Sequence, residues 1–411
     1  MAVIDDPEPA PALAISRPSR GRRIGAAVLL WLAALAAILA IAAIWVNRQV
    51  LDADNWSQTS TEVIANPTVR TAVSAFLVNQ LYARTDVTAQ VRKALPPRLK
   101  PLAGPVAGGL RDLGQKAVYG LLGLPTAQTI WRHANRLAIR QFDAIVEEKP
   151  GLVTSKGDAI ILDIRSVLVE VADRLGLPRS LVAKLPPNAG RITIASSHRV
   201  KQVKTAVKLV KGLQIVLPAI AFVLAAAAIW LSAGRRRRAL LLSGVALVGA
   251  GLFVLIARNV AGHQVTDALA ADASVQPAAH TTYSILTAML SEIAQAAILF
   301  GLAIALCAAV AGPRRWAIVV RRAVAPWLAQ RLGVSLAAVA AAFGLLVLWA
   351  PIPALRSPIP ALIALALLLV GVVVLRRQAG AEFPDARIGD TRAAIRAWWR
   401  RARRASDTAP V

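Results

Sequence analysis

The chain has 411 residues, of which 56% are hydrophobic, and its mean hydropathy is +0.56. This composition leaves too few polar residues to cover the surface of a soluble protein of this length. The formal net charge of +26 would suggest a nucleic acid partner for a soluble protein, but many of the basic residues lie beside apolar blocks. The sequence therefore predicts an integral membrane protein.

Six apolar segments lack charged residues and are close to the ~20 residues that a helix needs to cross a bilayer. They are residues 24–46, 213–234, 239–257, 293–311, 333–350 and 359–375. Backbone polar groups in lipid must be satisfied within the segment, so each is expected to be an α-helix. The first segment exceeds the ~7–15 apolar residues of a signal peptide, so we expect it to remain as a span.

The basic residues near the span ends predict the orientation. If the N-terminus is cytoplasmic, 22 Lys or Arg residues lie in the cytoplasmic segments 1–23, 235–238, 312–332 and 376–411. The two short outside loops, residues 258–292 and 351–358, then hold only 2. Because short cytoplasmic segments are enriched in Lys and Arg, both termini are expected in the cytoplasm. Residues 1–23 are expected to form a disordered tail.

Residues 47–212 are too polar to cross a membrane and too long for a simple loop. They predict an inserted, mostly helical extracytoplasmic domain, in which Asn66 and Pro67 are typical of a helix N-cap and first residue. Two segments rich in β-branched residues, 159–163 and 192–195, predict a small two-stranded β element, and residues 151–157 are expected to be a turn region. The expected fold class is mainly α.

Four lysines share one face of a helix that is expected to run from Ser197 into the second span. They are Lys201, Lys204, Lys208 and Lys211. One interpretation is the solvated face of a stalk. The other is contact with anionic lipid headgroups or an anionic wall polymer, where each lysine near the surface contributes about 1 kcal/mol.

Three further segments lie outside the spans. Residues 258–292 are expected to form an extracytoplasmic loop with one or two short helices. Residues 312–332 predict a cytoplasmic interfacial helix, with an apolar face that includes Val319 and Val320 opposite Arg321 and Arg322. The basic cytoplasmic tail, 376–411, is expected to bind anionic headgroups of membrane lipids, and not nucleic acid, through Arg396, Trp398, Trp399, Arg400 and Arg401.

The sequence shows no catalytic pattern: it has no GxSxG, P-loop, HExxH or strand-linked GxGxxG motif. His263 and Asp267 are one helical turn apart, but two potential ligands do not make a metal site. Glu292 and Gln295 lie at the outer end of the fourth span, and no ionisable residue lies at the centre of a span. We therefore expect no cofactor, no metal and no enzymatic activity.

Short motifs follow the first span. They are Leu-Asp-x-Asp at Leu51, Asp52 and Asp54, an Asn-Pro-x-Val-Arg helix start at Asn66, Pro67, Val69 and Arg70, and a later Leu-Pro-Pro. With these motifs the chain resembles uncharacterised multi-pass integral membrane proteins of actinobacteria. The resemblance covers the first span and the outside domain. It implies a multi-pass topology and a bacterial envelope location, and it implies no activity.

The function expected from the sequence is that of a non-enzymatic scaffold or sensor in the cell membrane. Its outside domain would bind an unknown protein partner, a lipid or a wall component. The alternative is a transporter or a membrane subunit of a transport complex. Polar side chains from several spans that meet at mid-depth would favour transport, whereas a dry, alanine-packed bundle and an outside apolar groove would favour the scaffold or sensor.

Overall fold

The computed structural model of the chain is mainly helical. It describes residues 20–147, 153–156, 159–163, 191–232, 235–269, 274–313, 315–330, 332–349, 353–355 and 357–382. The chain divides into two compact units. Unit 1 comprises Met1–Ala36, Ala219–Gly249 and Ala297–Val411, and unit 2 comprises Ala37–Pro218 and Ala250–Ala296.

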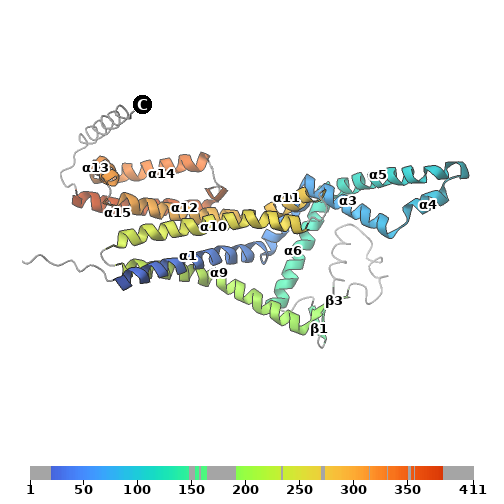
Figure 1. Cartoon of the computed structure of the whole chain (residues 1–411), viewed down its shortest axis with the longest axis horizontal. Helices are drawn as coiled ribbons and strands as arrows, with labels where there is room; N and C mark the ends of the chain where they lie inside the picture. The colour runs from blue at the N-terminus through green and yellow to red at the C-terminus, as the bar shows by residue number, and fades with distance from the viewer. Residues whose placement is uncertain are drawn as a thin grey trace, which may run out of the picture. The chain divides into compact units, whose positions relative to one another are not determined.

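Among the described residues, 6 helices are long and apolar enough to cross a membrane. They are α1 (Arg20–Gln49), α9 (Ser197–Leu231), α10 (Arg236–Leu269), α12 (Ala288–Val310), α14 (Leu332–Trp349) and α15 (Pro358–Glu382) (Figure 1). Each contains one of the apolar segments predicted from the sequence, or nearly all of it, so the prediction of six helical spans by length and composition is confirmed. The expected continuous helix from Ser197 into the second span is also confirmed, as α9.

Helix α10 continues well past the predicted end of the third span, through residues that were expected to start a loop. No proline interrupts this extension, and the hydroxyl of Thr266 donates to the carbonyl oxygen of Gly262 within the same helix. After the gap at 270–273, α11 (Gln276–Leu286) is the short helix expected in this segment. It contacts α2 and α3 of the same unit.

Unit 2 contains a set of shorter helices that precede the sheet. They are α2 (Ala53–Ala65), α3 (Pro67–Arg84), α4 (Val87–Ala94), the 3₁₀ helix η1 (Pro97–Leu102), α5 (Ala103–Gly123) and α6 (Pro125–Glu147). The predicted start of α3 is confirmed: Asn66 Oδ1 accepts from the backbone N–H of Thr68, and Pro67 occupies the first helical position. α2 packs on α6 and α3 packs on α5, and the segment from α3 to α5 forms a long arm (Figure 1).

The β element differs from the prediction. The structure has three antiparallel strands, β1 (Val153–Lys156), β2 (Ala159–Asp163) and β3 (Arg191–Ser196), in the order β1-β2-β3. The expected two-stranded ribbon was therefore wrong in its number of strands, because β1 lies in the segment expected to be a turn. The register is antiparallel: Val153 pairs with Leu162 and Lys156 pairs with Ala159.

Unit 1 is packed largely through alanine and glycine. Gly244 of α10 and Gly301 of α12 approach so closely that a Cβ atom on either would lie 2.6–2.7 Å from backbone atoms of the other helix. Because glycine has only a hydrogen atom as its side chain, the two helix backbones can come into direct contact. Such packing contacts hold membrane helices together where lipid provides no hydrophobic driving force between them. One cluster joins Phe343 of α14 to Ala361 and Ala364 of α15.

Candidate functional site

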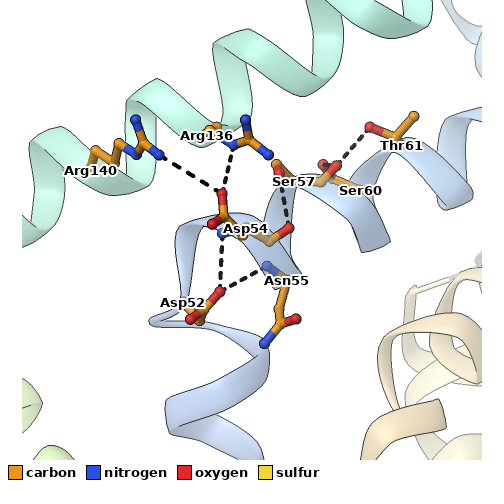
Figure 2. A network of polar contacts seen from close by, with 8 residues as sticks. All are labelled: Asp52, Asp54, Asn55, Ser57, Ser60, Thr61, Arg136 and Arg140. Atoms are coloured by element: carbon orange, nitrogen blue, oxygen red, sulfur yellow. Dashed lines mark hydrogen bonds and ion pairs between the residues drawn. The ribbon is translucent and has the colours of Figure 1, made fainter.

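The Leu-Asp-x-Asp motif builds the junction between α1 and α2 (Figure 2). Asp52 caps α2, because its Oδ1 atom accepts from the backbone N–H groups of Asp54, at 3.0 Å, and Asn55, at 2.9 Å. Asp54 forms an ion pair with Arg136 of α6 at 2.7 Å, and Arg140 lies 3.9 Å from the same oxygen. The motif therefore has a structural explanation: one carboxylate starts α2 and the other contacts the helix that packs on it.

Hydroxyl groups line the buried side of α2. Ser57, Ser60 and Thr61 are buried. Each hydroxyl donates to a backbone carbonyl oxygen of α2 itself, at 2.6–3.1 Å (Figure 2). Because their donors are satisfied inside one helix, these hydroxyls have no need of a ligand, and small polar side chains let α2 and α6 come close.

The lysine face predicted on α9 is only partly described. Lys208 is exposed, whereas Lys211 forms an ion pair with Asp143 of α6 at 3.0 Å. Lys201 and Lys204 lie on α9, but their side chains are outside the described residues. Next to this pair, Leu51 and Val207 form a buried cluster with Phe142 and Val210. Lys211 thus joins α9 to α6, which sequence spacing could not reveal.

Polar contacts and small residues hold α3 against α5. Arg70 donates to the hydroxyl of Tyr119 at 2.9 Å and lies 4.1 Å from the centre of its ring. The hydroxyl of Tyr82 donates to the carbonyl oxygen of Ala107, which is buried with Ala103. The two helices therefore pack closely, and the large aliphatic side chains of α5 lie outside their contact.

Those aliphatic side chains form an exposed row along α5, here called the α5 stripe. Their exposed fractions run from 39% to 63%, and they are Leu102, Val106, Leu110, Leu113, Leu121 and Leu124. Ala117 completes the spacing of three and four residues that places Val106, Leu110, Leu113 and Leu121 on one face of α5, and Leu102, the last residue of η1, and Leu124, the C-cap residue, lie at the two ends of the helix. Leu77 and Leu81 of the neighbouring α3 are exposed as well. An apolar face of this length is typical of an interaction surface.

Helix α5 agrees with the mostly helical content predicted for residues 47–212, but the α5 stripe was not predicted. Its signal was present in the spacing of the leucines. Such spacing usually marks the buried face of a helix, and only the packing of α3 on the adjacent face shows that this one is exposed.

The helix α13 (Arg315–Gln330) lies in unit 1, and one of its two arginines is placed differently from the prediction. Arg321 was expected on the polar outer face, but it is 2% exposed, and the buried side of α13 also carries Ala317, Ala325 and Leu328. Val319 and Val320 are exposed, as the apolar face of a helix that contacts lipid would be, so the difference concerns Arg321. The physical reason is the C-terminal end of α12, whose last carbonyl groups lack partners within the helix and need donors.

Arg321 supplies those donors. Its Nη1 atom donates to the carbonyl oxygens of Val310, at 2.7 Å, and Gly312, at 2.6 Å. Its Nε and Nη2 atoms donate to the two carboxylate oxygens of Glu382, at 2.9 and 3.3 Å. One guanidinium group therefore joins the end of α12, the middle of α13 and the end of α15.

No catalytic or metal-binding centre emerges from the described residues. No group of three His, Cys, Asp or Glu side chains in that part of the chain could hold a metal ion. Ser243 of α10 donates to the carbonyl oxygen of Ala239 in its own helix, and Gln295 of α12 carries a buried Oε1 atom without a partner. The lipid-binding residues expected in the tail, Arg396–Arg401, lie outside the described residues.

The fold and these sites define a class: the protein is a multi-pass integral membrane protein. Comparisons with protein-family models, curated proteins and solved structures found no match to the chain.

Proposed function

We propose that the protein is a non-enzymatic scaffold or sensor of the bacterial cell envelope, with unit 2 largely outside the cytoplasm and both termini inside. The orientation rests on the 22 basic residues of the cytoplasmic segments against 2 in the short outside loops. Its outside domain binds a protein partner through the α5 stripe. The envelope location rests on the resemblance to actinobacterial membrane proteins.

The α5 stripe is the single observation that carries this proposal. Its side chains are about half exposed, so covering each one contributes roughly 1 kcal/mol, and covering the row contributes roughly 6 kcal/mol before the costs of association. A long, convex row of leucines suits an apolar helix of another protein better than a polar wall polymer. Exposed Arg98 and Lys100 flank its N-terminal end and favour an acidic partner.

Transport has less support. A close helix contact in unit 1, between Gly244 and Gly301, brings backbones together and leaves no room for water or solute at that point. Among the described residues of the spans, Gln295 of α12 in unit 2 and Gln378 near the C-terminal end of α15 in unit 1 carry buried oxygens without a partner, and the apolar part of each span is otherwise built from uncharged side chains. A bundle of this kind would need polar groups from a partner subunit to form a path.

The test is crosslinking and pull-down with the full-length protein in native membranes, followed by identification of partners by mass spectrometry. Leu113→Arg should reduce recovery of the partner at least about tenfold, because it places a charge in the apolar contact. Gln90→Arg adds the same charge on exposed α4, off the stripe, and should retain the partner.

Three results would count against the proposal. Equal recovery by the Leu113→Arg and Gln90→Arg variants would remove the α5 stripe from the binding surface. Recovery of only a lipid or a wall fragment would contradict a protein partner. Solute uptake by proteoliposomes containing the purified protein, without any partner, would favour a transporter.

A further inference from the structure

Helices α14 and α15 pack closely over one half of their length and separate over the other. In the close half, Ala361 and Ala364 of α15 are buried against Phe343 of α14, together with Leu355 of the 3₁₀ helix η2 (Pro353–Leu355). In the other half a hollow of about 360 Å³ remains between the helices. Its lining consists of Leu336 from α14 and of Leu369, Val370, Val373, Val374 and Arg377 from α15.

The hollow opens on the outer surface of the helices. Val370, Val373 and Val374 are 61%, 39% and 47% exposed. In a membrane-spanning helix such a surface faces lipid, so the natural occupant of an apolar hollow here is an acyl chain. Its volume falls at the lower end of the range for small-molecule sites, ~300–1,000 Å³.

Arg377 is the one charged residue among the described residues that line the hollow, and its position indicates which kind of lipid would bind there. Arg377 and Leu369 lie at the two ends of the α15 lining, which at ~1.5 Å per residue spans about 12 Å. Half of a ~30 Å hydrocarbon core is about 15 Å, so the hollow matches the depth of one leaflet. Arg377 then lies at headgroup level, where its guanidinium group can donate to phosphate oxygens.

We propose that this hollow binds an anionic phospholipid, with one acyl chain between α14 and α15 and the phosphate at Arg377. The site is separate from the α5 stripe and does not depend on the proposed protein partner. The proposed orientation would place the lipid in the inner leaflet, but the binding itself requires only that α14 and α15 lie in the membrane.

Native mass spectrometry of the full-length, detergent-purified protein tests the site, with dioleoyl phosphatidylglycerol and dioleoyl phosphatidylcholine as probes. Arg377→Gln should lower phosphatidylglycerol occupancy about fivefold, the equivalent of ~1 kcal/mol per basic residue at a lipid surface. Arg376→Gln is the matched control, because Arg376 is exposed next to Arg377 and does not line the hollow. Arg377→Lys should retain most of the binding.

A second pair of variants tests the acyl chain. Val370→Trp fills the hollow and should lower its occupancy by both lipids. Leu362→Trp is the matched control, because it places the same ring on an exposed position of α15 outside the lining. Equal effects of Arg377→Gln and Arg376→Gln, equal effects of the two tryptophan variants, or no preference of the wild type for phosphatidylglycerol would each overturn the proposal. Selective loss with Arg377→Gln and Val370→Trp would support it.

Discussion

Replacing Arg321 by leucine tests whether its guanidinium group stabilises unit 1. The substitution removes hydrogen bonds from a buried, charged donor to two carbonyl oxygens, those of Val310 and Gly312. Hydrogen bonds from charged groups contribute about 1.5–3 kcal/mol each, and the desolvation of the arginine offsets part of this gain. The ion pair with Glu382 adds less than about 1 kcal/mol, because that carboxylate is 39% exposed and screened by solvent.

We therefore expect Arg321→Leu to lower the free energy of unfolding by about 3 kcal/mol. The assay is unfolding by sodium dodecyl sulfate in mixed micelles, followed by tryptophan fluorescence. Arg322→Leu is the control, because Arg322 is the exposed neighbour on the same helix, and it should change stability by less than about 0.5 kcal/mol.

The variant Glu382→Gln separates the two kinds of contact. It should cost less than Arg321→Leu, because Arg321 keeps both carbonyl acceptors and loses only the anionic partner. Equal destabilisation by Arg321→Leu and Arg322→Leu would refute the reasoning, since it would mean that the buried hydrogen bonds contribute nothing beyond the loss of a surface charge.

Three further predictions concern single positions. Asp52→Ala should lower the free energy of unfolding by about 1 kcal/mol, whereas Asp52→Asn should leave it unchanged, because asparagine also caps helices. If both variants lowered the melting temperature equally, the capping role of Asp52 would be contradicted. Gly244→Ala should destabilise by about 1–3 kcal/mol by forcing α10 from α12, whereas Gly249→Ala, with open space at its Cβ position, should be tolerated in the same detergent unfolding assay. In a Cys307→Ala background, Lys116→Cys should react with a membrane-impermeant maleimide in intact cells, and labelling only after lysis would contradict the proposed orientation.

The features that were predicted correctly are those set by neighbouring residues in the chain. An uncharged apolar run near 20 residues long must satisfy its own backbone in lipid, so the six helices follow from sequence alone. The start of α3 follows from Asn66 and Pro67 for a similar reason: the cap bond joins residues two apart.

Helix ends and strand number were predicted less well. α10 passes the end of its apolar run because a helix needs only its own hydrogen bonds to continue into water, and hydropathy does not mark where those bonds stop. β1 was missed because the short Val153–Lys156 segment is a strand only through pairing with β2, a contact that its own residues do not encode.

The sequence by itself determined that the chain is a six-helix membrane protein with a polar, mostly helical segment after the first span. Tertiary structure alone decided which faces of the helices are covered. Arg321 and the leucines of the α5 stripe show this in opposite directions: a charge expected at the surface is buried, and an apolar row typical of a core is exposed. Periodicity defines a face of a helix, but what covers that face depends on contacts between residues far apart in the chain.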